Sequence, residues 1–244
     1  MGSIVITGAS SGIGKSVAEK FLAEGWKVAL LARRKEPLEQ VANGHSNALA
    51  LPTDVTDEAQ VDAAFDKTAE AFGSIDVLFN NAGMFGTPGP IDEISYDSWR
   101  QVVDVNLNGM FLCARAAFRH MRRQDTRGGR IINNGSISAH VPRPGSISYT
   151  STKHAVTGLT KTLALDGRDF DIAAGQIDIG NARTELLDAL DARNLAADPN
   201  AQPQPSMEVT DVAEAVFYMA GLPLSANVLT MTVMATKMPY VGRG

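Results

Sequence analysis

Short apolar runs with the composition of buried β-strands alternate along the chain with stretches of helical periodicity. The strand-like runs are Ser3–Thr7, Lys27–Leu31, Ala48–Leu51, Ile75–Phe79, Arg130–Asn134, Ile172–Ile177 and Val228–Val233. Continuous apolar strands separated by helices are typical of a parallel sheet that is covered on both faces. Because crossovers between parallel strands are right-handed, the pattern predicts a doubly wound α/β fold with a parallel seven-stranded sheet.

The segments between these strands show the spacing of amphipathic helices. They are Gly12 to about Glu24, Glu36–Ala42, Asp57–Phe72, Asp97 to about Arg123, Ser148–Asp166 and Glu208–Ala220. Gly25 is expected to stop the first helix, and Thr56 is expected to cap the third. The 244 residues can form one sizeable core, so residues 1–244 are predicted to be a single domain.

Composition excludes several classes of partner and site. The net charge of −5 gives no basic surplus for nucleic acid or an anionic membrane, and no apolar run approaches the roughly 20 residues of a membrane span. Cys113 is the single cysteine, and the four histidines lack ligand spacing, so we expect no disulfide and no metal site. Because a strand begins at Ser3, no signal peptide is expected; we predict a soluble, cytoplasmic protein.

The least regular stretch covers residues 185–207, which are polar and acidic and include Pro199, Pro203 and Pro205. In a single-domain enzyme, an insertion of this kind often forms a mobile substrate lid. The alternative is a disordered surface loop. We favour the lid.

A glycine-rich turn, Thr7–Gly14, joins the first strand to the first helix. Gly8 permits a sharp turn, Gly12 lets the backbone approach a ligand, and Gly14 allows close packing of helix on strand. The helix N-terminus then offers free N–H groups to a pyrophosphate. The turn predicts a Rossmann-type dinucleotide site with contacts from Gly8, Ser10, Ser11, Gly12, Ile13 and Gly14. The alternative is a glycine-rich turn that binds nothing.

The end of the second strand bears on the choice of dinucleotide. NAD sites usually place an acid there for the ribose 2′-hydroxyl, but this chain has Arg33 and Arg34. A guanidinium suits a 2′-phosphate, so NADP(H) is favoured, with NAD(H) as the alternative. The alternative is that Arg33 and Arg34 are two solvated arginines at the start of a helix, with no role in binding.

Tyr149 and Lys153 lie four residues apart on a predicted helix and therefore share a face. A neighbouring cation favours the phenolate, so we expect a lowered pKa for Tyr149 and a role in proton transfer. Most pairs with this spacing are solvated helix faces. Ser136, 13 residues upstream, and the glycine-rich turn give the functional interpretation its weight.

With these motifs, the chain resembles the short-chain dehydrogenase/reductase family over nearly its whole length. TGASSGIG at Thr7–Gly14 matches its glycine motif, and SYTSTK contains its YxxxK pair. The remaining matches are Asp54 and Val55 for adenine, Asn81, Ala82 and Gly83 for the NAG motif, Asn106 for the catalytic asparagine and Ser136 for the catalytic serine.

The resemblance implies that Asn106, Ser136, Tyr149 and Lys153 are the catalytic residues. Tyr149 would exchange a proton with the substrate oxygen, and Ser136 would hydrogen-bond that oxygen. Lys153 would hold the nicotinamide ribose. Asn106 would interrupt its helix and hold a water that links Lys153 to solvent. The coenzyme would supply the hydride chemistry without a metal.

Two features depart from the family pattern. Ile179 replaces the usual proline before Gly180, although the positions expected to contact coenzyme remain as Gly180, Ala182 and Thr184. The C-terminus lacks the usual Asp-Gly-Gly, which leaves homodimer and homotetramer both open. The apolar residues Phe111, Ala117, Ala155 and Leu159 would serve a subunit contact or pack in the core.

We expect the substrate to lie against Met84–Pro90, Ser138–Pro144 and the lid. His140 is expected to be a polar wall residue. Arg143 is expected to be a solvated loop arginine, and the alternative is an arginine that pairs with an anionic substrate. The predicted function is NADP(H)-dependent hydride transfer to or from a ketone, aldehyde or secondary alcohol. The alternatives are an NADPH-binding regulator without turnover and an NAD-dependent alcohol dehydrogenase.

Overall fold

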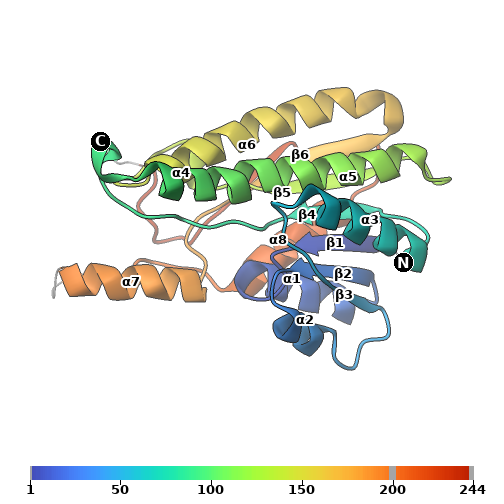
Figure 1. Cartoon of the computed structure of the whole chain (residues 1–244), viewed down its shortest axis with the longest axis horizontal. Helices are drawn as coiled ribbons and strands as arrows, with labels where there is room; N and C mark the ends of the chain where they lie inside the picture. The colour runs from blue at the N-terminus through green and yellow to red at the C-terminus, as the bar shows by residue number, and fades with distance from the viewer. Residues whose placement is uncertain (1, 198–201, 242–244) are drawn as a thin grey trace.

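The computed structural model describes residues 2–197 and 202–241, which contain a seven-stranded parallel sheet (Figure 1). The strands are β1 Ser3–Thr7, β2 Lys27–Ala32, β3 Ala48–Pro52, β4 Val77–Asn80, β5 Gly129–Asn134, β6 Ile172–Ile179 and β7 Thr230–Val233. Their order is β3-β2-β1-β4-β5-β6-β7, and every neighbouring pair is parallel. The predicted doubly wound fold is therefore confirmed.

Helices cover both faces of this sheet. They are α1 Gly12–Ala23, α2 Lys35–Ala42, α3 Glu58–Phe72, α4 Tyr96–Val103, α5 Met110–Arg123, α6 Ile147–Asp166, α7 Glu185–Ala197 and α8 Val209–Gly221. Figure 1 shows α3, α5 and α6 on one face, and α1, α2 and α8 on the other. Within the described residues, no helix combines the length and the hydropathy that a bilayer crossing needs.

Alternate side chains along β1 pack into two separate hydrophobic cores, one on each face of the sheet. Ile4 and Ile6 pack in the core beneath α1 and α8, where they contact Phe21 and its neighbours. Val5 packs in the opposite core, beneath α3 and α5, together with Phe65. All of these side chains are fully buried. The sheet is thus held from both sides, which fixes the positions of its strand ends.

The sheet reverses its direction of winding between β1 and β4. The chain moves outward from β1 to β2 and β3, and then returns to place β4 on the other side of β1. Connections that leave adjacent strands in opposite directions open a crevice at the carboxyl ends of those strands. The loops after β1 and β4 therefore border the position at which doubly wound folds bind ligands.

Two local predictions are wrong. Residues 185–197 form helix α7 instead of an irregular stretch, because the helix-favouring run from Glu185 precedes all three prolines. Part of the predicted lid, 198–201, lies outside the described residues. At α3, the N-cap is Asp57, whose carboxylate accepts from the backbone N–H of Gln60; Thr56 instead donates to Asp54.

One buried cation anchors the end of α8 to the sheet. Arg130 is 1% exposed and donates to Asn227 Oδ1 (3.0 Å) and to the carbonyl of Ala226 (2.9 Å). We predict that Arg130→Ala lowers the free energy of unfolding by about 3 kcal/mol, because the hydrogen bonds from a buried guanidinium to the segment after α8 are lost. Urea denaturation measures this loss. Arg123→Ala, at an exposed position, should change stability by under about 0.5 kcal/mol.

Candidate active site

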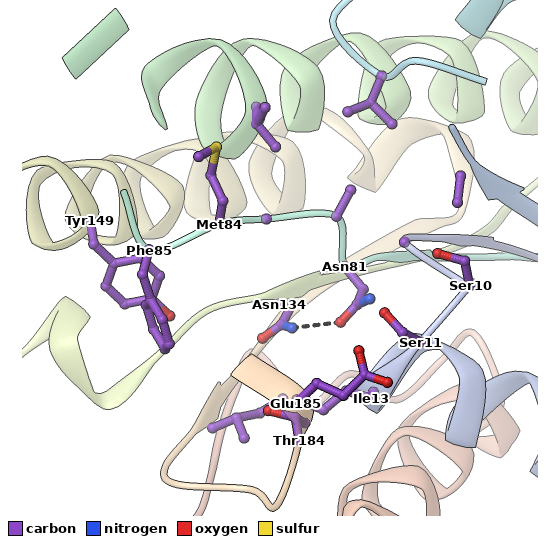
Figure 2. A pocket seen from close by; sticks show the side chains of 18 of the residues that line it. Ser10, Ser11, Ile13, Asn81, Met84, Phe85, Asn134, Tyr149, Thr184 and Glu185 are labelled. Atoms are coloured by element: carbon purple, nitrogen blue, oxygen red, sulfur yellow. Dashed lines mark hydrogen bonds between the residues drawn. The ribbon is translucent and has the colours of Figure 1, made fainter. Parts of the chain in front are cut away.

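A cavity of about 960 Å³ lies at the carboxyl ends of the strands. Most of the residues predicted to bind coenzyme line it: Gly8, Ser10, Ser11, Gly12, Ile13, Arg33, Arg34, Asp54, Val55, Asn81, Ala82, Gly83, Tyr149, Lys153, Gly180, Ala182 and Thr184. Figure 2 shows Tyr149 and Phe85 at one end, and Ser10 and Ser11 toward the other. The structure thus brings segments between Gly8 and Leu187 to one cleft.

The glycine-rich turn requires the glycines that it contains. Gly8 and Gly12 have φ values of +68° and +52°, a region that most side chains avoid. Gly14 is outside the cavity lining and packs against the turn. A Cβ there would overlap with the carbonyl oxygen of Gly8 and would lie 2.7 Å from Nδ2 of Asn81. The turn therefore leaves space for a ligand on its cavity side. On the side where Gly14 packs, it leaves no space for a side chain.

The N-terminus of α1 faces this space without a side-chain cap. Ser11 is the N-cap, with an extended backbone, and its hydroxyl makes no capping hydrogen bond. The first turn of α1 contains no acidic residue. Backbone N–H groups at such a terminus can bind an anion, so the cradle fits a pyrophosphate.

The far end of the cavity is cationic. Arg33 and Arg34 line it at the end of β2, and both are exposed. Neither arginine forms an ion pair with another described residue. Asp54, on the neighbouring loop, accepts hydrogen bonds from the backbone N–H (3.0 Å) and the hydroxyl (2.8 Å) of Thr56. The Asp54 carboxylate is therefore hydrogen-bonded within its own turn, and Arg33 and Arg34 supply positive charge at this end of the cavity.

Asn81 joins three strands at the centre of the cavity. Its Nδ2 donates to the carbonyl of Thr7 at 2.9 Å, and its backbone N–H donates to the Thr7 hydroxyl at 2.8 Å. Its Oδ1 accepts from Nδ2 of Asn134 at 2.7 Å (Figure 2). These bonds fix the loop that continues through Ala82 and Gly83 along the cavity wall.

Asn106 interrupts its helix, as the sequence predicted. Asp104–Gly109 forms a π-helical turn between α4 and α5, and Asn106 is fully buried within it. Its amide pairs with the backbone of Met84 through two hydrogen bonds of 2.8 Å, and its Nδ2 also donates to Thr152 Oγ1 at 3.3 Å. Asn106 thus ties the loop after β4 to α6. It lies outside the cavity lining.

Tyr149 lies where the loop after β4, the loop after β5 and α6 meet. Its ring packs edge-on against Phe85, with centroids 4.7 Å apart. Burial raises the pKa of its phenol above the ordinary 10.0, although the hydroxyl of Ser136 and the charge of Arg143 lower it. The expectation of a lowered pKa is therefore wrong, because burial outweighs the groups that stabilise the phenolate.

Lys153 lies one turn further along α6, with Nζ 5.5 Å from the Tyr149 ring centroid. The ammonium donates to the carbonyl of Asn134 at 2.7 Å. Burial lowers the pKa of Lys153 to about 8, while the negative charge of Asp178 raises it by less. Two of the three ammonium donors remain available to a ligand in the cavity.

The loop after β6 completes the cavity despite the replacement of proline by Ile179. Gly180 packs against Met234, and Ala182 forms a single β-bridge with Met207. Arg143 is half-buried and donates to Asn181 Oδ1 at 3.0 Å, so the expectation that it is solvated is wrong.

Sequence reasoning missed Asn134 and Asp178. Asn134 lines the cavity and bonds both Asn81 and Lys153. Asp178 is fully buried and accepts from the backbone N–H of Ser136 at 3.0 Å. The available signal was polarity: an amide and an acid occur near the ends of two predicted buried strands, where apolar residues are usual.

A glycine cradle, a cationic end and the Tyr149–Lys153 pair thus line one cleft, with the Ser136 hydroxyl beside Tyr149. A family model described as short chain dehydrogenase matches residues 3–195. The chain belongs to this family, whose members are oxidoreductases that act on alcohol and carbonyl groups.

Relatives and structural neighbours agree with this membership. The chain is 38% identical to 2-(R)-hydroxypropyl-CoM dehydrogenase of Xanthobacter autotrophicus, covering 89% of this chain and 90% of that protein. A 3-ketoacyl-(acyl-carrier-protein) reductase from Brucella melitensis, complexed with NADH, superposes with a TM-score of 0.86, 28% identity and coverage of 96% and 97%. Serine dehydrogenase complexed with NADP⁺ superposes with a TM-score of 0.88 and 26% identity. The match covers 99% of this chain and 98% of that one.

We predict that Gly14→Ala destabilises the junction of β1 and α1 by about 3 kcal/mol, because the added Cβ would overlap with backbone. Urea denaturation and the quenching of tryptophan fluorescence by NADPH measure stability and binding; both should fall. Gly158→Ala is the matched control. It lies in α6 with nothing within 4 Å of the added Cβ, and it should raise stability by up to about 1 kcal/mol.

Proposed function

We propose that this chain is an NADP(H)-dependent oxidoreductase that interconverts a small ketone or aldehyde and the corresponding alcohol, with Tyr149 as its acid and base. One observation carries the proposal. Tyr149, beside the Ser136 hydroxyl and one helical turn from Lys153, stands at one end of a cavity whose other end is an uncapped glycine cradle. A dinucleotide that spans such a cavity would present its reactive end to Tyr149.

Tyr149 is suited to donate a proton to a carbonyl oxygen. Its phenol carries its proton at neutral pH, as carbonyl reduction requires; the raised pKa reflects burial and does not by itself make the phenol a stronger acid. Ser136 Oγ accepts from the backbone N–H of Ser138 at 3.1 Å, which leaves its own hydrogen to be donated. That hydrogen would stabilise the negative charge that develops on the substrate oxygen.

Lys153 and the backbone around it would position the coenzyme. The coenzyme supplies or accepts the hydride when it is bound. Lys153 Nζ, held by the carbonyl of Asn134, has donors left for hydroxyl groups of a ribose. Gly180, Ala182 and Thr184 form the adjacent wall. Asn106 acts at a distance, because its amide holds the loop that carries Met84 and the residues beyond it.

The charge at the end of β2 supports NADP(H) over NAD(H). Arg33 and Arg34 line the cavity, and the nearby Asp54 is engaged with Thr56. A guanidinium forms strong hydrogen bonds with a phosphate, whereas the ribose 2′-hydroxyl of NAD(H) calls for an acid. The similarity to complexes with NADH and with NADP⁺ is compatible with either coenzyme, so the arginines carry this part of the proposal.

We propose a secondary alcohol or its ketone as the substrate class. The relative from Xanthobacter is named as a dehydrogenase of a 2-hydroxypropyl compound, which supports this choice. The substrate would meet Met84 and Phe85 beside Tyr149, and residues 185–207 would cover it as a lid. A homodimer or homotetramer is also proposed. Phe111 is 49% exposed and available for a contact, whereas Ala117 is fully buried in the core.

The first test removes the proposed acid. Tyr149→Phe should lower kcat for the reduction of 2,3-butanedione by NADPH about a thousandfold, because a general acid contributes at this scale. NADPH binding, measured by fluorescence, should persist. Tyr96→Phe, at a 72% exposed tyrosine, is the matched control and should leave kcat unchanged. Full activity of Tyr149→Phe would remove the acid/base assignment. If the wild-type protein does not consume NADPH with diketones, quinones, aldehydes or steroids, a regulator without turnover is favoured.

The second test concerns the coenzyme. Arg33→Ala should raise KM for NADPH by roughly 10- to 100-fold and leave KM for NADH nearly unchanged, because the lost charge faces only a 2′-phosphate. Steady-state kinetics with both coenzymes measure the ratio. Lys35→Ala, which removes a neighbouring exposed cation that pairs with Glu39, is the control and should affect both coenzymes little. Equal effects of Arg33→Ala on the two coenzymes would contradict the preference.

A further inference from the structure

The roles assigned to the catalytic residues leave one carboxylate near them unused. Asp178, in β6, is fully buried. Its Oδ1 accepts from Gln176 Nε2 at 2.6 Å and from the backbone N–H of Ser136 at 3.0 Å, and its Oδ2 lies 2.8 Å from Nε2 of His140. An ionised carboxylate is costly to bury unless donors surround it, so these three contacts form a site built for a carboxylate.

The backbone beside Ser136 is shaped around this carboxylate. A Cβ on Gly135 would overlap with Oδ1 of Asp178 and would lie 2.7 Å from Nε2 of Gln176. Glycine at this position therefore lets β5 and β6 approach closely enough for the carboxylate to reach the Ser136 N–H. The contact depends on residues from two strands, so it is a feature of the folded site.

We propose that Asp178 is a positioning residue for the catalytic centre: its carboxylate orients Ser136 through the backbone N–H and supplies a fixed negative charge beside Tyr149 and Lys153. The proposal rests on the proposed function insofar as it concerns catalysis by Tyr149. Asp178 does not contact the substrate in this scheme. It acts through the residues that do.

The charge of Asp178 opposes the other charges around Tyr149. Lys153 faces the phenol from α6, Arg143 and the partly exposed His140 face the site from the loop after β5, and Asp178 faces it from β6. A nearby negative charge favours the neutral phenol and the protonated ammonium. The charge of Asp178 acts to raise the pKa of Tyr149 and to offset part of the lowering that burial causes in the pKa of Lys153, which agrees with this sign. Asp178 thus acts to extend toward higher pH the range in which Tyr149 keeps its proton.

The test measures the titration of Tyr149 directly, without a substrate. The chain has four tyrosines, and ¹³Cζ labelling with NMR reports each phenol; Tyr149→Phe identifies the signal of interest. We expect Asp178→Asn to lower the titration midpoint of Tyr149, because a negative charge that acts on the phenol is removed. The asparagine Oδ1 can still accept from the Ser136 N–H, and its Nδ2 can donate to His140 Nε2 in the tautomer with hydrogen on Nδ1, so both residues keep a partner while the charge is lost.

His140→Gln is the matched control. Glutamine can still donate to the carboxylate, and Asp178 keeps its charge. The midpoint of Tyr149 should stay unchanged or rise in this variant, and it should not fall. Asp178→Ser also removes the charge and provides the same test if the asparagine variant does not fold.

Kinetics give a second measurement. With NADPH and 2,3-butanedione, the loss of reduction activity at high pH should begin at a lower pH in Asp178→Asn than in the wild type. An unchanged midpoint in a folded Asp178→Asn or Asp178→Ser protein would overturn the proposal, even if turnover fell. A shifted midpoint together with full turnover by Tyr149→Phe would instead overturn the proposed function and leave the assignment of Asp178 intact.

Discussion

The site depends on the hydrogen bond of 2.7 Å between Lys153 Nζ and the carbonyl of Asn134. This bond ties α6 to Asn134, the last residue of β5. Because Tyr149 precedes Lys153 by one helical turn, the same bond sets the position of the phenol relative to the sheet. Asn134 also holds Asn81 through its side chain, so α6 and the loop after β4 are placed together. A buried ammonium is costly, and burial accordingly lowers its pKa to about 8.

A row of buried amides extends this arrangement across three strands. Asn80 bonds Asn133 at 3.3 Å, and Asn133 donates to Thr160 at 2.9 Å on α6. Thr160 lies 3.3 Å from Gln176, which donates to Asp178 at 2.6 Å. Buried polar groups destabilise a core unless each finds a partner, and here the partners form one continuous chain. A network of this kind resists local sliding of α6 over the sheet. It therefore protects the geometry of Ser136 and Tyr149, even where an apolar core would stabilise the fold more.

The sequence predicted the elements whose physics is local or periodic. Apolar runs located every strand, and the glycine spacing located the cradle, since only glycine fits at Gly8 and Gly14. It failed where the outcome depends on competition between neighbours or on contacts across strands. Asp57 displaced Thr56 as the cap of α3 because its carboxylate reaches the N–H of Gln60. The contact between Asp178 and the backbone of Ser136 joins residues 42 positions apart, and no spacing rule predicts it.

The topology explains why these parts meet. The cradle follows β1, and the loop after β4 begins on the adjacent strand, so the crevice between them opens where the winding reverses. Strand order then places β2, with Arg33 at its end, on one side of the cradle, and β5 and β6 on the other. Positive charge gathers at the β2 side, while the β6 side carries the buried Asp178. The sheet therefore places the residues suited to bind an anion and the residues around the Tyr149 phenol at different strand ends. One cleft can contain both groups because it extends across these strands.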